Sequence, residues 1–458
     1  MYDKQMIYNV IFCAPCLLGV AGKALAVPAI ENWETKNGAK VMFVRAPELP
    51  MLDVRVVFDA GSARDNAKAG VANLSNGLLS EGAGGKTADQ IAEGFDALGA
   101  RFGNGALRDM AFVSLRSITA ADKLKPALDL LATVLHKPDF PTDAFARERS
   151  RLLIALQARQ QSPESVAEDA YFKAVYGEHP YAAYPGGTEA SVKALSTADL
   201  KAFYKKYYVA KNAIIALVGD MTKDEAAQIA ERLTAPLPAG EHAPALPEVQ
   251  PLEKAAEQRL DYPSAQTHVL LGQPGLKRGE PELFALYVGN HTLGGNGLVS
   301  RLSQVIREDR GLSYSVYSYF SPMRQLGPFT AGLQTANENT ETATKLLRDT
   351  IADYVKTGPT EEELNASKKN ITGGFALNLD SNSKITEQVA MIGFYGLPLD
   401  YLNTYIEHVN AVTREAAQKA IAARLKPDAM VTVIVGGSGG GGDGQPAQKP
   451  AAKAGGPG

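Results

Sequence analysis

Two side chains in the stretch from Leu293 to Tyr319 could bind the same substrate atom. Arg307 lies at the end of a predicted helix, and Tyr314 lies in a predicted strand over residues 313–319. Only one tight turn separates the two elements. A guanidinium and a phenol are both hydrogen-bond donors, so the pair could hold a single oxygen. Taken alone, such a pair is more often a surface arginine and a sheet tyrosine.

A glycine-rich turn precedes this pair and opens the predicted helix. Its glycines are Gly294, Gly295 and Gly297. Apolar residues then recur at helical spacing, namely Leu298, Leu302, Val305 and Ile306. Because glycine has no side chain, these residues would let a peptide approach the backbone closely, so we predict that they contribute to substrate binding. An ordinary helix N-terminus would explain them nearly as well.

The whole stretch resembles the C-terminal domain signature of the pitrilysin/insulinase family of zinc peptidases. The resemblance extends over about residues 30–436. In that family, an arginine and a tyrosine at this spacing help to hold the substrate and its oxyanion. The resemblance therefore implies a substrate-binding or oxyanion-binding role for Arg307 and Tyr314.

The order of elements along the chain indicates a duplication. Four landmarks of the N-terminal part recur in the same order 217 to 219 residues later. They are Pro141-Thr142 with Pro359-Thr360, Tyr176-Gly177 with Tyr395-Gly396, Ser196 with Thr413, and the strand from Ala213 with that from Met430. We therefore predict an α+β protein of two homologous domains, each a mainly antiparallel sheet packed with helices. In the family, two such domains form half of a clamshell.

The boundaries of these domains follow from changes in composition. We predict an N-terminal peptidase-like domain over residues 27–234 and a C-terminal one over residues 252–436. Between them, residues 235–251 carry five prolines without apolar periodicity, which is typical of an extended, semi-rigid linker. Residues 437–458 are rich in glycine, proline, alanine and lysine, a composition typical of a disordered tail.

The first 26 residues have the pattern of a secretory signal peptide. An apolar run, Met6–Val20, is followed by the small-x-small cleavage site Ala24-Leu25-Ala26. We expect cleavage after Ala26 and a periplasmic mature protein. The only two cysteines, Cys13 and Cys16, fall within this segment. The run is too short to span a bilayer, so no integral membrane segment is predicted in the mature form.

The composition of the 458 residues is that of an ordinary globular protein, with 45% hydrophobic and 21% charged residues. The formal net charge is −3, which gives no basic footprint for a polyanion. We therefore predict no nucleic-acid partner.

Active members of the family bind zinc through the motif H-x-x-E-H on a helix of the N-terminal domain. The two histidines are metal ligands, the glutamate acts on the bound water, and a later glutamate completes the site. The matching helix of this chain reads VANLSNG and places Asn73, Asn76 and Gly77 at the three motif positions. The later glutamate would fall near Ile154 or Ala155.

None of these residues can replace the missing groups. Asparagine amides are poor zinc ligands and cannot act as a general base at neutral pH, and glycine has no side-chain donor. The six histidines are scattered, without a pair three or four residues apart. The sequence therefore predicts no metal site and no cofactor in this chain, and a chain that is inactive as a peptidase by itself.

The retained Arg307 and Tyr314 then need another explanation. Some family members divide the work between two chains, of which one carries the zinc motif and the other carries the Arg/Tyr pair. This sequence resembles the second kind, as in mitochondrial processing peptidase subunits and exported bacterial members. The resemblance implies a heterodimer in which a homologous subunit with an intact H-x-x-E-H motif brings the zinc. Arg307 and Tyr314 would then donate hydrogen bonds to a carbonyl of the peptide or unfolded protein substrate.

Two other classes of function stay open. A non-catalytic structural protein of this fold would leave Arg307 and Tyr314 dispensable. A peptide-binding protein acting alone would capture extended peptides at a sheet edge. A neighbouring gene for a similar exported chain with an intact H-x-x-E-H motif would favour the split peptidase over both. The sequence also leaves a homodimer open.

Overall fold

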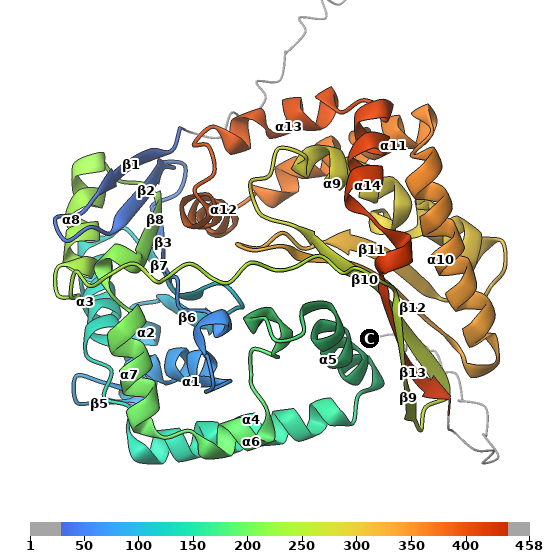
Figure 1. Ribbon diagram of the computed structural model, residues 1–458. Coiled ribbons are helices and arrows are strands. Elements are labelled where there is room, and N and C mark those ends of the chain that lie inside the picture. Colours follow the sequence, from blue (N-terminus) through green and yellow to red (C-terminus); the bar gives the residue numbers. More distant parts are fainter. Residues whose placement is uncertain (1–28, 438–458) are drawn as a thin grey trace, which may run out of the picture.

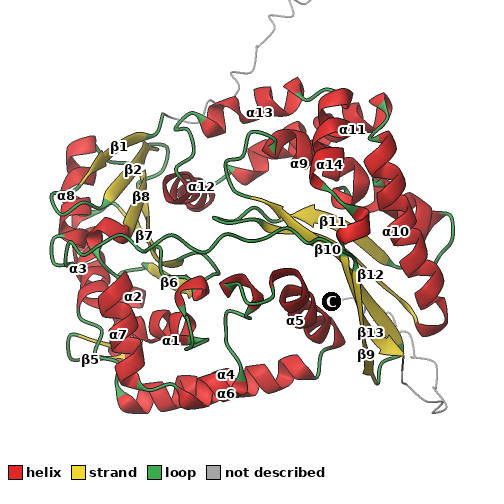
Figure 2. Ribbon diagram, viewed as in Figure 1, coloured by secondary structure: helices red, strands yellow, loops and turns green. Residues whose placement is uncertain are grey.

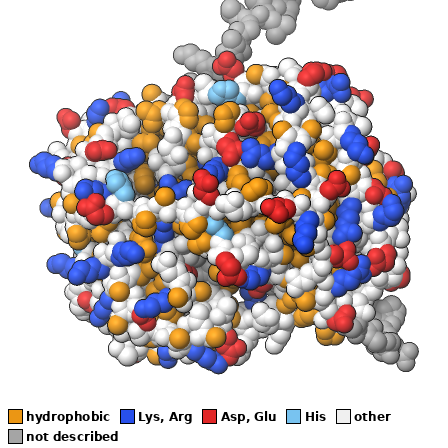
Figure 3. All heavy atoms as spheres, in the orientation of Figure 1, with side chains coloured by type: hydrophobic (Ala, Val, Ile, Leu, Met, Phe, Trp, Pro, Cys, Tyr) orange, Lys and Arg blue, Asp and Glu red, His pale blue; other side chains and the backbone are white. Residues whose placement is uncertain are grey.

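The computed structural model describes residues 29–437, which form two halves with one large β-sheet each (Figures 1 and 2). The predicted signal peptide with Cys13 and Cys16 lies outside the described residues, as do residues 438–458 of the predicted tail. Within the described range, no helix combines the length and the apolar character that crossing a bilayer requires. On the face shown in Figure 3, positive and negative side chains are interspersed.

The N-terminal half contains a six-stranded sheet in the order β1-β2-β8-β3-β7-β6. These strands are β1 (Glu31–Glu34), β2 (Lys40–Arg45), β3 (Met51–Phe58), β6 (Arg101–Ala106), β7 (Ala111–Ile118) and β8 (Ala213–Gly219). A separate short hairpin pairs β4 (Gly82–Ala83) with β5 (Lys86–Thr87). The helices are α1 (Val71–Gly77), α2 (Ala88–Ala97), α3 (Ala121–His136), α4 (Thr142–Gln160), α5 (Pro163–Tyr176), α6 (Glu189–Ala194), α7 (Thr197–Tyr207) and α8 (Lys223–Thr234). Strand β8 reads AIIALVG and is buried at every position, because both faces of the sheet are covered.

The C-terminal half contains a five-stranded sheet in the order β11-β12-β10-β13-β9. Its strands are β9 (Ala256–Tyr262), β10 (Gln266–Leu276), β11 (Ser315–Phe320), β12 (Gly327–Ala336) and β13 (Val431–Gly437). Its helices are α9 (Leu283–Asn290), α10 (Thr340–Thr357), α11 (Glu361–Phe375), α12 (Asn382–Tyr395), α13 (Tyr401–Ala411) and α14 (Arg414–Arg424).

The two sheets share one topology. In each sheet one pair of strands is parallel, β2 with β8 and β9 with β13. The other strands follow in antiparallel order, β8-β3-β7-β6 in one sheet and β13-β10-β12-β11 in the other. Strand β1 is an addition at the edge of the first sheet. The predicted α+β class with two homologous halves is therefore confirmed.

Three of the four landmarks found in the sequence are helix ends in both halves, and the fourth is the pair of strands β8 and β13. Ser196 accepts a hydrogen bond from a backbone N–H of the first turn of α7, and Thr413 does the same for α14. Tyr176 and Tyr395 are the last residues of α5 and α12. A glycine at positive φ follows each of them, as is common after helix C-termini. Helix caps and C-terminal glycines act within a few residues of the chain, so the sequence alone shows that they recur in both halves.

Each half contributes one helix to the sheet of the other half. Helix α5 lies on β10 and β13, and α12 lies on β8, β3 and β2 (Figure 1). The hydroxyl of Tyr171, on α5, donates a hydrogen bond to the carbonyl oxygen of Phe329 at 2.6 Å. On α12, a Cβ at Gly393 would lie only 2.8 Å from the side chain of Ile214, so the helix approaches the sheet closely. The hydrophobic clusters at these contacts consist of residues from both halves.

The proline-rich segment between the halves is packed against both of them. It crosses the molecule without regular secondary structure (Figure 1), and Leu246 and Val249 are buried beside α5 and β13. The carbonyl oxygen of Pro244 accepts a hydrogen bond from Arg64 at 2.6 Å. The segment is therefore packed against both halves, and is not only the spacer that its composition predicts.

One buried carboxylate connects the two halves. Asp109 lies in the turn between β6 and β7 and is 3% exposed. It accepts a hydrogen bond from the hydroxyl of Tyr181 in its own half. From the C-terminal half, it accepts one from the hydroxyl of Tyr395 at 2.9 Å and one from the backbone N–H of Arg324 at 2.7 Å. The end of α12, the helix that packs on the sheet of the N-terminal half, is thus held by that half.

Candidate functional site

Arg307 and Tyr314 lie next to each other at the surface of the C-terminal half. Arg307 belongs to a π-helical turn, Ser303–Glu308, and Tyr314 directly precedes β11. The guanidinium carbon of Arg307 is 5.0 Å from the centre of the Tyr314 ring, which is a cation–π distance. Tyr314 is 85% exposed, so its hydroxyl is open to solvent. The structure brings the two predicted donors together, and their role stays a prediction.

A short turn fixes this arrangement. Gly311 has φ +62°, a left-handed conformation that ends the helix after Arg307. The hydroxyl of Ser313 then donates to the carbonyl oxygen of Gln334 on the neighbouring strand β12, at 2.8 Å. The regular strand begins at Ser315, two residues later than predicted. Because Ser313 is tied to β12, Tyr314 projects from the point where β11 begins.

The helix before the pair is shorter than predicted. Leu302 and Ile306 are fully buried, as their spacing predicts, but Leu298 is 60% exposed. The reason is the extended backbone of Ser300, which interrupts the helical phase between Leu298 and the residues after it. The continuous helix begins only at Arg301.

Close packing explains one of the three glycines predicted to bind substrate. Gly294 is buried, and a Cβ there would lie 2.4 Å from the hydroxyl oxygen and 2.5 Å from the backbone nitrogen of Ser318. The side-chain amide of Asn290 donates to the carbonyl oxygen of Ser318 at 2.9 Å and holds this contact. The turn after α9 can therefore lie directly on β11. Gly295 and Gly297 are exposed and stay predicted substrate-binding residues.

Replacing Gly294 by alanine is expected to lower the free energy of unfolding by about 1–3 kcal/mol, because the added Cβ would overlap the backbone of Ser318. The matched control is Gly373→Ala in α11, where a Cβ meets nothing within 4 Å. That change should stabilise the protein by about 0.5–1 kcal/mol through helix propensity. Urea unfolding of both variants measures the difference. An unchanged midpoint for Gly294→Ala would contradict the packing role.

The three motif positions lie on α1, where two of them contain amide side chains and the third none. Asn76 is 1% exposed, and its Nδ2 donates to the carbonyl oxygen of Phe112 and to the hydroxyl of Tyr208, both at 3.1 Å. This side chain fastens α1 to β7 and to the end of α7. Asn73 is half-buried. Gly77 is exposed, with open space where a Cβ would stand.

The position of the distal ligand offers no carboxylate. Ile154 and Ala155 are exposed residues of α4. Glu81, the carboxylate that follows the motif most closely in sequence, forms an ion pair with Arg147 of α4. In the part of the chain that the structure describes, no group of three or more histidine, cysteine, aspartate or glutamate side chains could hold a metal ion. The residues present at the motif positions therefore do not fit a zinc ion.

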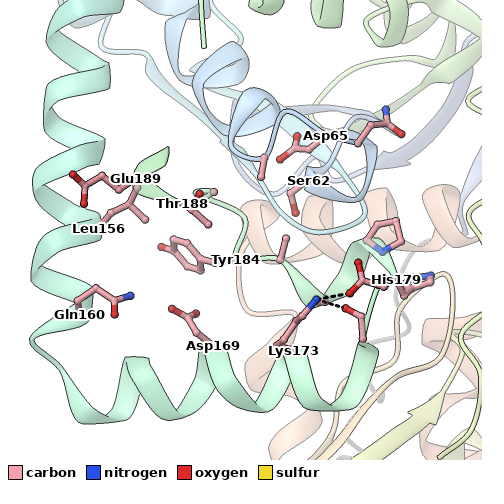
Figure 4. Close-up of a pocket in the computed structure, with 18 of the residues that line it drawn as sticks. Ser62, Asp65, Leu156, Gln160, Asp169, Lys173, His179, Tyr184, Thr188 and Glu189 are labelled. Atoms are coloured by element: carbon pink, nitrogen blue, oxygen red, sulfur yellow. Dashed lines mark hydrogen bonds and ion pairs between the residues drawn. The ribbon is translucent and has the colours of Figure 1, made fainter. Parts of the chain in front are cut away.

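A large cavity lies beside α1, in the elbow between α4 and α5 (Figure 4). Its volume is about 1040 Å³. Figure 4 shows Leu156 and Gln160 on α4, and Asp169 and Lys173 on α5, around this space. The cavity could not be predicted from the sequence, because its walls come from segments that are far apart in the chain.

The charged side chains of this cavity are engaged in contacts of the fold. Lys173 donates to Glu178 at 2.8 Å, and Asp169 accepts from Arg159 at 2.8 Å. The carboxylate of Asp65 accepts hydrogen bonds from two backbone N–H groups at the start of α1, at 2.7 and 2.9 Å. Such contacts position α1 and α5.

The histidine of this cavity is also used by the fold. Nδ1 of His179 accepts a hydrogen bond from the backbone N–H of Tyr181 at 3.1 Å. Nε2 lies 3.0 Å from the carbonyl oxygen of Pro247 and donates to it. Burial lowers the pKa of His179, which favours this neutral, singly protonated ring.

Two family models match the chain, one in each half. The model for insulinase (peptidase family M16) matches residues 40–188, and the model for the peptidase M16 inactive domain matches residues 194–371. An uncharacterized zinc protease of Mycobacterium leprae is 30% identical over 352 residues, which are 76% of this chain and 78% of that protein. The chain belongs to the insulinase family, peptidase family M16.

The chain is also similar to other proteins and solved structures. An uncharacterized zinc protease of Bacillus subtilis is 27% identical over 361 residues, which cover 78% of this chain and 86% of that protein. The crystal structure of a peptidase M16 inactive domain from Pseudomonas fluorescens has a TM-score of 0.86 and 42% identity, and covers 89% of this chain and 98% of that one. A protease from Helicobacter pylori has a TM-score of 0.82 at 21% identity, covers 89% of this chain and 99% of that one, and supports the fold alone.

Membership in the M16 family confirms the resemblance seen in the sequence. The match over residues 40–188 includes Asn73, Asn76 and Gly77. This chain is therefore an M16 protein, and the residues that the sequence predicts at the motif positions are two asparagines and a glycine. Its C-terminal half presents an exposed tyrosine with an arginine at its side.

Proposed function

We propose that this chain is the non-catalytic subunit of a two-chain M16 zinc peptidase. It pairs with a homologous subunit that has an intact H-x-x-E-H motif, and it contributes Arg307 and Tyr314 to the binding of a peptide or unfolded protein. One observation carries the proposal: the adjacent Arg307 and Tyr314 side chains are at the surface of a chain whose motif positions do not fit zinc.

The surroundings of the pair support contact with another molecule. A tyrosine that is 85% exposed contributes little to the core of its own chain. The turn that precedes the helix adds Leu298 and Val299, which are 60% and 75% exposed. Exposed apolar and aromatic side chains next to an arginine are typical of protein and peptide contact surfaces.

In the proposed assembly, hydrolysis is carried out by the partner, and this chain holds the substrate. The guanidinium of Arg307 and the hydroxyl of Tyr314 donate hydrogen bonds to one peptide carbonyl oxygen. Donors that are already in place stabilise the negative charge that grows on this oxygen more than they stabilise the neutral carbonyl. The pair therefore accelerates the reaction without taking part in proton transfer.

We also propose that the mature protein works in the periplasm. The proposal rests on the apolar run and on the cleavage site that ends at Ala26. Cell fractionation with N-terminal sequencing of the mature chain tests it. A cytoplasmic chain with an intact N-terminus would overturn it.

The test of the proposed function is a peptidase assay on a quenched peptide library. We expect the chain alone, and its closest H-x-x-E-H-bearing relative from the same cell alone, to be near background. The mixture is expected to cleave, and a chelator should abolish the cleavage.

The oligomeric state of the mixture, measured by light scattering, makes a negative result informative. A stable complex without activity would favour a structural role for the chain. Saturable peptide binding by the chain alone, without a complex and without cleavage, would favour a peptide-binding protein of the same fold.

A further inference from the structure

A second cavity lies in the C-terminal half, between α9, α12, α13 and the end of α11. Its volume is about 270 Å³, which is close to the lower end of small-molecule sites at roughly 300 Å³. Aromatic side chains form much of its wall, namely Phe284, Tyr287, Phe320, Phe375, Tyr401 and Tyr405. Such walls favour an apolar occupant.

Arg278 is the only charged residue among the described residues that line this cavity. Its Nε is buried and has no hydrogen-bond partner in the described part of the chain. Its guanidinium carbon lies 5.5 Å from the centre of the Tyr395 ring. The carboxylates that follow it most closely in sequence, Glu280 and Glu282, pair with Arg424 instead. The cavity thus contains a cation and no carboxylate of its own.

The corresponding place in the N-terminal half is lined by different side chains. The two cavities lie in equivalent elbows, between α4 and α5 in one half and between α11 and α12 in the other. Four carboxylates line the cavity of the N-terminal half: Asp65, Asp169, Glu178 and Glu189. The duplicated fold therefore accommodates a cavity lined by carboxylates at this place as well as one lined by aromatic side chains. An aromatic lining with one arginine is a property of this half and not a requirement of the fold.

These features select one kind of ligand. A guanidinium binds a carboxylate through two parallel hydrogen bonds, and it does so better than any other side chain. Asn378 and Gln388 also line the cavity and add amide donors for the same group. The aromatic walls then cover an apolar body attached to the carboxylate.

We propose that this cavity binds a small amphipathic carboxylate, with the acid group on Arg278 and the apolar body against the aromatic walls. A medium-chain fatty acid and the carboxyl terminus of an apolar peptide share this chemistry. The site is distinct from the proposed substrate-binding pair. Tyr314 precedes β11 and Phe320 ends it, so the two places are about 20 Å apart along the strand. The proposal does not depend on the proposed function.

Isothermal titration calorimetry of the full chain tests the proposal with two acids and their neutral analogues. The probes are octanoate with octanol, and N-acetyl-Phe-Leu with its amide. We expect saturable binding of at least one acid, and an affinity about 10- to 100-fold lower for its neutral analogue, because the analogue cannot form a charge-assisted hydrogen bond. Tighter binding of octanoate would identify a lipid source, and tighter binding of the peptide acid would identify a peptide carboxyl terminus.

Two substitutions of Arg278 separate charge from geometry. Arg278→Met should lower the affinity for the acid by about 10- to 100-fold, so that the acid and its neutral analogue bind with similar affinity. Arg278→Lys keeps the charge but cannot form two parallel hydrogen bonds, so its affinity for the acid should lie between those of the wild type and Arg278→Met. Arg101→Met, at an exposed arginine of β6, is the control and should bind as the wild type does.

Three results would overturn the proposal. Neither acid binds saturably, or acid and neutral analogue bind equally well to the wild type, or a folded Arg278→Met variant binds the acid with wild-type affinity. Circular dichroism and the thermal midpoint of each variant confirm that it is folded.

Discussion

Replacing Arg307 by alanine is expected to lower kcat/KM of the proposed two-chain peptidase by about 10²–10³-fold, the usual effect of removing one oxyanion donor. The physical reason is the loss of a charged donor that lies beside the Tyr314 side chain, 5.0 Å from the ring centre. If the donors act mainly on the oxyanion, most of the loss appears in kcat. If they act on the ground-state carbonyl, KM rises instead.

The fold should tolerate this substitution. The ion pair of Arg307 is with the adjacent Glu308, at 3.4 Å on the surface, and surface pairs of this kind contribute about 0–1 kcal/mol. The variant should therefore unfold at nearly the wild-type urea concentration and should still form the complex. A loss of activity with unchanged assembly is what distinguishes a substrate-binding residue from a structural one.

Steady-state kinetics of the mixture with Arg307→Ala, Tyr314→Phe and Arg310→Ala measures the effect. Arg310 is the matched control, because it is an exposed arginine of the same turn and donates to the carbonyl oxygen of Val305, at 2.8 Å. We expect Tyr314→Phe to resemble Arg307→Ala and Arg310→Ala to resemble the wild type. Full activity of the Arg307→Ala mixture would show that the pair is dispensable, and a structural role would take over.

Replacing Asp109 by alanine is expected to lower the free energy of unfolding by about 3–5 kcal/mol. The substitution removes the common acceptor of the hydroxyls of Tyr181 and Tyr395 and of the backbone N–H of Arg324. Each donor that stays buried without a partner costs about 1–3 kcal/mol. Asp109→Asn keeps one acceptor oxygen and should cost less. The effect is large because this carboxylate is at the junction of the two halves.

Urea unfolding of the mature chain, followed by circular dichroism, measures this prediction. The control is Asp353→Ala, at an exposed aspartate of α10, which should stay within about 0.5 kcal/mol of the wild type. Hydrogen exchange of the turns around Asp109 and Arg324 gives a second readout and should increase in Asp109→Ala. An Asp109→Ala variant as stable as the Asp353→Ala control would mean that the halves are held together without this carboxylate.

Features with local or periodic causes could be predicted from the sequence. The caps at Ser196 and Thr413 depend on one side chain and the next turn of helix. The approach of Arg307 to Tyr314 depends on a short turn that Gly311 makes possible. The duplication was visible because such signals recur at one spacing in both halves. Each of these causes acts over a few residues, and a linear sequence records it directly.

Only the tertiary structure decided which surfaces meet. An apolar face on α5 or α12 shows that the helix is buried, but it does not show that each helix lies on the sheet of the opposite half. The need for glycine at position 294 could not be predicted either, because the residue that leaves no room for a Cβ there is Ser318, on β11. Asp109 and Arg278 were not identified from the sequence, since their partners and cavity walls come from distant segments. Long-range packing depends on several segments at once, and no single stretch of the chain records it.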